Sequence, residues 1–427
     1  MIPYLVHLTV LAALVGLLYQ RSARAPLRKL FFYALPAKLL AGIALGLLYT
    51  HYYPYPSDTF LFFADARLLA RLAGDSPEAY ARVLLFDRFP DARLPAALVY
   101  GSESRSFFFV KTLSLLNVAT ANSYWLASLY LSLFSFWGLW RAANALALRF
   151  PGTHRAAALG FLFFPSVVFW SSGVLKESLV MGAIGGLTAA GLTCVGEAKK
   201  PPRSWHPRQG FLVGLALVVL WKLKYHYFVA FVACAAAGGG AILVCRRLRV
   251  ESRWAKIGVW LLGFVGLASL GTLLHYNLHL ANFLAVLVQN HDTIYALSAP
   301  ENRIEFNHLT PDPVSLLRNL PVALLSGLFR PLVWEGRTLP QWLTGTENLF
   351  LLGLTGIAGY RFGKGQAFGP APFSFLPAFT AGAYILLLAT TLAFSTPNFG
   401  TLARYKVAFL PFFVYLLAVG AARNHDE

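Results

Sequence analysis

Apolar runs of about 20 residues, separated by short charged islands, make up most of this 427-residue chain. A helix of roughly that length crosses the ~30 Å hydrocarbon core of a bilayer. Residues 156–196 illustrate the pattern, because their only charged residues are the adjacent Lys176 and Glu177 at the midpoint. Two spans must therefore meet at this pair, and residues 209–245 repeat the arrangement around a second charged midpoint.

This pattern predicts an all-α fold, namely a polytopic membrane protein with about eleven transmembrane helices in a single integral membrane domain, residues 1–427. The composition agrees, since 57% of the residues are hydrophobic and 13% are charged, against roughly 25% charged in soluble domains. Soluble, disordered and disulfide-stapled classes are thereby excluded. The expected spans are 3–19, 30–50, 119–147, 154–171, 175–195, 209–223, 226–246, 256–275, 344–360, 371–394 and 404–421.

The positive-inside rule orients these spans, because short cytoplasmic loops are enriched in Lys and Arg. Lys and Arg far outnumber acids in the islands assigned to the cytoplasm, which are Arg21 to Lys29, Arg149 to Arg155, Lys199 to Arg208, Arg246 to Lys256, Arg361 to Lys364 and the tail at Arg423. The distribution predicts an outside N-terminus and an inside C-terminus. It also accounts for the net charge of +18 without a nucleic-acid partner.

Two long segments, residues 51–118 and 276–343, fall on the outer side and mix polar with apolar residues. In the first, Asp75-Ser-Pro-Glu78 resembles a helix-capping sequence, which predicts an amphipathic helix through Arg88. In the second, residues 316–334 are apolar but are interrupted by two prolines and an arginine. That interruption predicts a re-entrant or interfacial helix rather than a span.

Basic residues on the outer side are the main functional signal, because the insertion rule disfavours them in short loops. Six lie at or near span ends: Lys176, Lys222, Lys224, Arg330, Arg404 and Lys406. Together they predict an anion-binding site, although each alone could snorkel to lipid head groups. His226 lies beside two of them, but a single interfacial histidine is usually structural. Residues 395–406 combine Asn, Gly, Thr and Tyr405 with two cations at a predicted helix N-terminus, which suits phosphate.

Three carboxylates are candidate catalytic groups: Asp58, Asp65 and Glu177. Asp58 is the preferred general base, because it follows the second span in a proline-rich segment that holds it at the membrane surface. If residues 58–72 are helical, Asp58 and Asp65 share a face, and Asp65 then suits a salt bridge better than catalysis. The alternative for Asp58 is a helix N-cap. The alternatives for Glu177 are an ion pair or a favourable charge at a helix N-terminus.

Glu335 follows Arg330 in the second outer segment, so the two either form an ion pair there or contact substrate. No motif assigns a metal or another cofactor to the chain. Cys194, Cys234 and Cys245 lie inside or at the ends of apolar runs without CxxC spacing, which indicates packing.

The layout of most of the chain resembles the GT-C class of polyprenol-phosphate-dependent glycosyltransferases, which includes protein O-mannosyltransferases and lipid A aminoarabinose transferases. Asp58 stands in the first large outer segment, where that class has its catalytic aspartate, but the familiar Asp-Glu or Asp-Asp pair is absent at Asp58-Thr59. Three segments also look like membrane proteins from bacterial surface-polysaccharide clusters: Phe164 to Ser178, Phe329 to Pro331 and Asn398 to Lys406.

The resemblance implies a glycosyltransferase of the bacterial cytoplasmic membrane that works at the periplasmic face. It implies a lipid-linked (polyprenyl-phosphate) sugar donor and a glycan, lipid or protein acceptor. The donor phosphate would lie among Arg404, Lys406, Lys222 and Lys224, which would stabilise the leaving phosphate. Asp58 would take the proton from the acceptor hydroxyl.

Two other classes fit part of the pattern. An O-antigen-type polysaccharide polymerase or ligase would share the outer phosphate site, use a lipid pyrophosphate donor, and rely on arginines and histidine in a later loop. A transporter or flippase of an anionic lipid or solute places ionisable residues near the midplane on broken helices. Here only Lys38 lies inside a span, while Pro36 and Pro165 offer helix breaks.

Overall fold

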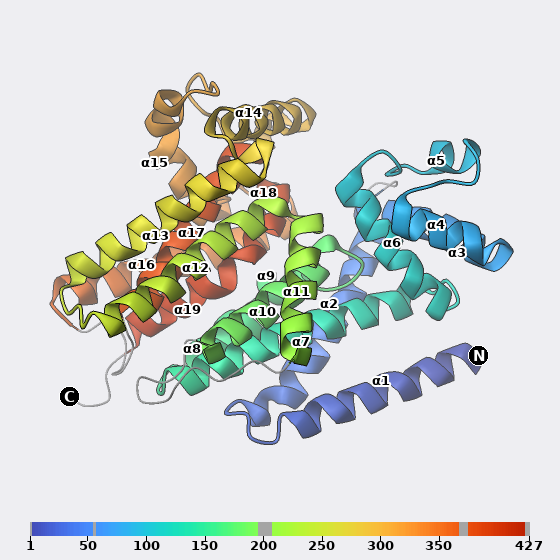
Figure 1. Ribbon diagram of the computed structural model, residues 1–427, viewed down its shortest axis with the longest axis horizontal. Coiled ribbons are helices and arrows are strands. Elements are labelled where there is room, and N and C mark those ends of the chain that lie inside the picture. Colours follow the sequence, from blue (N-terminus) through green and yellow to red (C-terminus); the bar gives the residue numbers. More distant parts are fainter. Residues whose placement is uncertain (1, 54–56, 195–206, 367–374, 423–427) are drawn as a thin grey trace. The chain divides into compact units, whose positions relative to one another are not determined.

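The computed structural model describes residues 2–53, 57–194, 207–366 and 375–422. Every regular element in these ranges is a helix (Figure 1), so the all-α prediction is confirmed. The chain divides into two compact units. Unit 1 comprises Met1–Asn144, Val168–Ala189 and His206–Tyr225, and unit 2 comprises Ala145–Val167, Ala190–Trp205 and His226–Glu427.

Unit 1 holds most of the helices in the N-terminal half of the chain and parts of others. Its complete helices are α1 (Ile2–Arg21), a 3₁₀ turn (Arg28–Leu30), α2 (Phe31–His51), α3 (Asp58–Asp75), α4 (Pro77–Phe86), α5 (Arg93–Ala97), α6 (Ser104–Ala119) and α11 (Pro207–Leu223). It also contains most of α7 (Tyr124–Arg149) and α10 (Lys176–Cys194) and the end of α9 (Pro165–Trp170).

Unit 2 holds the C-terminal helices and the segment between α7 and α9. Its helices are α8 (His154–Ala158), a π-helical turn (Leu159–Phe163), nearly all of α12 (Tyr225–Arg247), α13 (Arg253–Leu274), α14 (Leu280–Leu297), α15 (Pro313–Phe329), α16 (Leu339–Gly363), α17 (Phe375–Ser395), α18 (Phe399–Tyr405) and α19 (Leu410–Ala421). Short 3₁₀ turns lie at Tyr276–Leu278, Pro300–Asn302, Val333–Glu335 and Lys406–Ala408.

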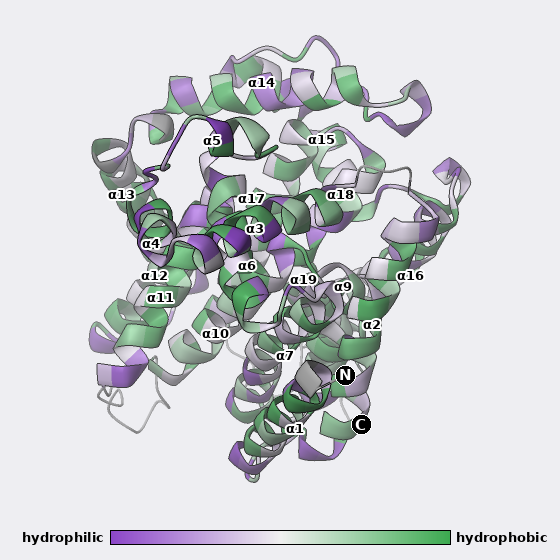
Figure 2. Cartoon of the chain, turned by 90° about the vertical axis from the view of Figure 1, so that its right-hand side faces the viewer, coloured by the Kyte–Doolittle hydropathy of each residue, from purple (hydrophilic) through white to green (hydrophobic). Residues whose placement is uncertain are grey.

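Six helices in the described ranges are long and apolar enough to cross a membrane: Tyr4–Arg21, Arg28–His51, Lys176–Cys194, Tyr225–Arg247, Arg253–Leu273 and Phe375–Ser395. The pair Phe399–Ala408 and Leu410–Ala421, bent by 72°, would make a seventh span if it counts as one. Hydrophobic residues follow α2 along most of its length, whereas α14 mixes hydrophobic and hydrophilic residues (Figure 2). These apolar helices indicate an integral membrane protein.

Several of the eleven expected spans differ from this set. Residues 154–171 form α8, a π-helical turn and α9 instead of one helix, because Phe164 is extended and Pro165 begins α9. A residue before proline disfavours helical geometry, and proline suits the first helical position. The expected span 209–223 is the 17-residue α11, and 404–421 is divided by the bend between α18 and α19.

In unit 1, α3 packs along α6, and α4 packs against α3 (Figure 1). Ser76 caps α4 by accepting the Ala79 N–H, so the predicted helix start is correct, with the cap one residue after Asp75. The apolar side chains between α3 and α6 are buried: Phe62, Leu69, Phe109 and Leu113.

The second outer segment folds around α14, α15 and α17 of unit 2. A Cβ on Gly327 of α15 would lie 2.2 Å from the Ala389 carbonyl oxygen of α17, so only glycine allows these helices to approach so closely. Ser315, Asn319 and Ser326 of α15 are buried, whereas Arg318 is exposed; Asn319 accepts the Asn307 N–H and donates to the Asn307 carbonyl. Leu317 of the same helix is 65% exposed.

Candidate functional site

The segment between α9 and α10, residues 171–175, is buried without being helical. Lys38 of α2 donates to the Ser171 hydroxyl and to the Val168 carbonyl, at 3.2 Å for the latter. Ser172 donates to the Val168 carbonyl at 2.6 Å. Lys38, the one ionisable residue expected inside a span, therefore satisfies the C-terminal end of a broken helix.

Side chains of two more helices form hydrogen bonds with the backbone of the rest of this segment. Gly173 has a positive φ of 69°, which favours glycine, and donates its N–H to Ser132 of α7 at 2.9 Å. Thr59 of α3 donates to the Val174 carbonyl at 2.9 Å. A buried backbone needs such partners where water is absent. The segment is thus held by α2, α3 and α7, and it fixes the first residues of α10.

Lys176 and Glu177 begin α10 directly after this segment. The Lys176 ammonium donates to the Ser106 hydroxyl of α6 at 2.8 Å and lies 4.8 Å from the centre of the Phe62 ring. Ser106 in turn donates to Glu103 at 2.7 Å. Lys176 is therefore linked to a carboxylate through one hydroxyl and is fixed over an aromatic face.

Glu177 forms an ion pair with Lys224, the residue between α11 and α12, at 3.6 Å. Both side chains are buried, with 2% and 9% exposed. The ion-pair interpretation of Glu177 is therefore supported, with Lys224 as its partner. A carboxylate in the first turn of α10 is also favoured by the helix dipole.

Arg105 adjoins Ser106, the partner of Lys176, and Lys222 is two residues before Lys224. We call these four residues the unit 1 cation cluster: Arg105, Lys176, Lys222 and Lys224. The Arg105 guanidinium lies 4.2 Å from the centre of the Tyr225 ring. Arg105 and Lys222 are exposed, and neither forms a hydrogen bond or ion pair with another residue that the structure describes. Lys222 is three residues from Tyr225, which limits the separation of their Cα atoms to about 11 Å.

Arg105 was not among the sequence candidates. The available signal was its position in the first turn of α6, where the helix dipole disfavours a cation.

Asp58 is the first residue of α3 and is exposed. Ser57 occupies the N-cap position without a side-chain hydrogen bond, so Asp58 is not the cap. The neighbouring Thr59 contacts the Val174 carbonyl, and Phe62, one turn along α3, lies under the Lys176 ammonium. These contacts bring the N-terminus of α3 to the Lys176 side of the cluster within unit 1.

Asp65, a candidate for catalysis or a salt bridge, has a different role. Its side chain is buried, with 2% of the residue exposed, and accepts the N–H groups of Val99 and Tyr100 at 3.1 and 2.8 Å. Burial raises the pKa of the Asp65 carboxyl above its ordinary value, while the two backbone hydrogen bonds oppose the shift. Asp65 anchors the loop that follows α5, and its catalytic assignment is not supported.

Lys406 of unit 2 is buried, with 1% of the residue exposed. Its ammonium donates to the carbonyls of Leu328 and Arg330 at 2.8 and 3.3 Å and to the Asn348 amide oxygen at 3.0 Å. Asn348 donates to the Pro331 carbonyl at 2.8 Å. An ammonium has three N–H groups, so protein oxygens use all of them. Lys406 therefore holds the turn after α15 instead of binding a phosphate directly.

Arg330 lies on the turn that Lys406 holds. Its guanidinium donates to Glu335 at 2.8 Å and lies 4.9 Å from the centre of the Phe399 ring. The second Glu335 oxygen accepts the Leu332 N–H at 2.7 Å. The ion-pair interpretation of Arg330 and Glu335 is thus supported.

The expected phosphate site in residues 395–406 is not supported. Asn398 accepts the Thr401 N–H at 3.0 Å and donates to Ser298 at 2.9 Å, so its amide is used to cap α18. The helix itself has only seven residues, Phe399–Tyr405. Arg404 is half-buried, 5.2 Å from the centre of the Tyr405 ring, and the Tyr405 carbonyl accepts the Tyr227 hydroxyl at 3.1 Å.

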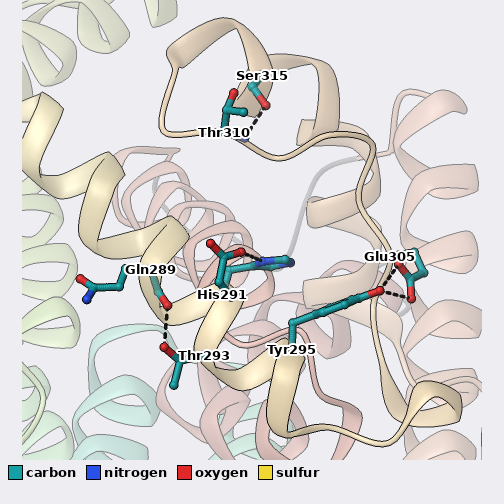
Figure 3. A network of polar contacts seen from close by, with 8 residues as sticks. Gln289, His291, Thr293, Tyr295, Glu305, Thr310 and Ser315 are labelled. Carbon is teal, nitrogen blue, oxygen red and sulfur yellow. Dashed lines mark hydrogen bonds and ion pairs between the residues drawn. The ribbon is translucent and has the colours of Figure 1, made fainter.

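Two histidines of unit 2 lie in aromatic surroundings. His226 packs edge-on against the Tyr227 ring, with centroids 4.5 Å apart. His291 of α14 contacts Asp292 at 3.0 Å and stacks on Tyr295, whose hydroxyl donates to Glu305 (Figure 3). The His291 network ties α14 to the following loop.

No group of three or more His, Cys, Asp or Glu side chains in the described ranges could hold a metal ion. The chain was also compared with known proteins. No protein-family model matches it, and neither a curated protein nor a solved structure is significantly similar to it.

Proposed function

We propose that this chain is a membrane glycosyltransferase that moves a sugar from a polyprenyl-phosphate donor to an acceptor hydroxyl. The observation that carries the proposal is the exposed Asp58 carboxylate at the N-terminus of α3, on the side of unit 1 where Lys176 is fixed. A carboxylate beside fixed cations can remove a proton while the cations stabilise a departing phosphate.

The chemistry assigns separate roles to the residues of unit 1. Asp58 accepts the proton of the acceptor hydroxyl, while the oxygen of that hydroxyl bonds to the anomeric carbon of the sugar. The bond from that carbon to the phosphate oxygen breaks, and its electron pair remains on the phosphate. Arg105 and Lys222 have N–H donors available for that phosphate, while Lys176 contributes charge from a fixed position.

The membrane arrangement belongs to the same proposal. We propose about eleven crossings in a bacterial cytoplasmic membrane, with the N-terminus outside, the C-terminus inside and residues 51–118 and 276–343 at the periplasmic face. The exposed leucines of α15, such as Leu317, and the buried Asn319, whose hydrogen bonds are made within the protein, support a re-entrant helix in contact with lipid.

The test is an Asp58→Asn variant of the full chain in nanodiscs, assayed for sugar transfer from polyprenyl-phosphate donors to candidate acceptors. Loss of the base should lower kcat by about 10²- to 10⁴-fold. Asp75→Asn is the matched control, because it removes another exposed carboxylate from the same helix. Full activity of Asp58→Asn would remove Asp58 as the base.

One observation favours a second candidate, a transporter of an anionic lipid or solute. The buried break between α9 and α10, supported by Lys38, resembles the broken helices of transporters. The discriminating experiment is flux of a fluorescent anionic lipid in proteoliposomes. Flux that Lys38→Met abolishes and Asp58→Asn leaves intact would favour transport over sugar transfer.

A further inference from the structure

The unit 1 cation cluster contains two compensated and two uncompensated positive charges. Glu177 offsets Lys224 directly, and Glu103 offsets Lys176 through the Ser106 hydroxyl. Arg105 and Lys222 have no carboxylate partner within the described ranges. The cluster therefore offers two positive charges with unused N–H donors to an incoming anion.

The proposed transfer changes the charge of the lipid phosphate. In the donor, the phosphate is a diester with one negative charge. The bond to the anomeric carbon breaks, the electron pair stays on oxygen, and the acceptor proton goes to Asp58. The released lipid phosphate is a monoester, which carries close to two negative charges at neutral pH because its second pKa is roughly 6.

We propose that Arg105 and Lys222 make the site selective for a lipid phosphate monoester over the diester donor, so that the product is retained after transfer. This inference rests on the proposed function. It places the protein before a reaction that consumes lipid phosphate monoester, such as esterification with a new sugar or hydrolysis to the alcohol.

The geometry of Arg105 supports this selectivity. The Arg105 guanidinium lies over the Tyr225 ring, 4.2 Å from its centre, and a planar guanidinium binds two phosphate oxygens at once. A monoester presents three terminal oxygens, whereas a diester presents two. Lys222 lies three residues before Tyr225 in the chain, and we assign its charge to the extra negative charge of the monoester.

The test measures binding to the full chain in phosphatidylcholine nanodiscs with three probes: farnesyl phosphate, its methyl diester and inorganic phosphate. We expect the wild type to bind the monoester roughly tenfold more tightly than the diester. The reason is that the additional negative charge of the monoester faces a cation that has no carboxylate partner among the described residues. Arg105→Gln should remove most of that preference. Arg71→Gln, which removes an exposed arginine from α3, should leave it unchanged.

A second variant and a competition experiment complete the test. If Arg105→Gln does not fold, Lys222→Gln should lower the same preference, since Lys222 is exposed on α11. Inorganic phosphate should compete only weakly; if it competes as strongly as farnesyl phosphate, the assignment to a lipid is wrong. Equal affinities of the wild type for monoester and diester would overturn the proposal.

The transfer assay separates this inference from the proposed function. Inhibition of sugar transfer by farnesyl phosphate, relieved in Arg105→Gln, is the expected result. Monoester selectivity without any sugar transfer would refute the glycosyltransferase proposal but would leave the proposed phosphate site intact. Sugar transfer that farnesyl phosphate does not inhibit would refute product retention but would leave the glycosyltransferase proposal intact.

Discussion

Lys406 of unit 2 and the pair Arg105 and Lys222 of unit 1 differ in how their N–H groups are used. In unit 2, the Lys406 ammonium gives its N–H groups to three protein oxygens and is buried. In unit 1, Arg105 and Lys222 are exposed and donate to no other described residue. The contrast teaches that a cation near a span end is a candidate ligand-binding group only if its donors are not already used by the fold.

The acids of α3 differ in burial within one helix. Asp58 is exposed at the first position, whereas Asp65 is buried two turns later and accepts two backbone N–H groups. Changes to the buried residues should therefore alter stability, and changes to the exposed ones should alter ligand binding or catalysis. Three substitutions below differ in the size of that effect.

The largest effect on stability should come from Lys406→Met. Methionine fills a similar volume but leaves the Leu328 carbonyl and the Asn348 amide oxygen without their donor. An unsatisfied buried acceptor costs about 1–3 kcal/mol, so we expect a loss of about 3 kcal/mol in the free energy of unfolding. Thermal unfolding in detergent would measure it.

The matched control for Lys406→Met is Lys364→Met, because Lys364 is exposed at the end of α16 in the same unit. The control should unfold at the wild-type temperature. Equal unfolding temperatures for both variants would mean that the turn after α15 does not depend on Lys406.

A smaller effect is expected from Asp65→Ala, at about 2 kcal/mol, because the Val99 and Tyr100 N–H groups lose their acceptor. The wild type should also show a pH dependence. Since the folded pKa of Asp65 lies above its ordinary value of 3.8, the folded state binds this proton more tightly, and stability falls as pH rises through the interval between the two pKa values.

Unfolding followed from pH 3.5 to pH 7 would test this dependence. Asp65→Asn should remove that part of the slope, and Asp75→Asn, an exposed change on the same helix, should retain it. A slope that survives in Asp65→Asn would assign the pH dependence to another group.

The sequence was sufficient for the fold class because the hydrophobic runs depend only on local composition. It placed helices correctly where one run is one helix, as in α2 and α17. It was wrong for residues 154–171, because the extended Phe164 and the π-helical turn interrupt the apolar run without any charged residue. A hydrophobicity pattern does not reveal where the backbone departs from α-helical geometry.

The candidate site could be predicted only in part. Residues 58–72 are helical, which was the condition for Asp58 and Asp65 to share a face, but helical spacing could not reveal that Val99 and Tyr100 would bind Asp65 from a distant loop. Lys222 and Lys406 look alike in sequence as single lysines at span ends. The acceptors that distinguish them come from segments far apart in the chain, and no local pattern encodes such contacts.

The smallest effect on stability should come from Lys222→Ala. Lys222 is exposed and contacts no described residue through a hydrogen bond or ion pair, so the unfolding temperature should not change. Its affinity for farnesyl phosphate should nevertheless fall several-fold at low salt, because one cation facing the phosphate is lost. The difference between variant and wild type should shrink as salt rises, since an exposed charge is screened beyond roughly 8 Å at physiological ionic strength. The loss of unfolding free energy in Lys406→Met should not shrink as salt rises, because the contacts of Lys406 are buried. A salt-insensitive loss of affinity in Lys222→Ala would show that Lys222 acts through the fold, as Lys406 does, and would remove it from the phosphate site.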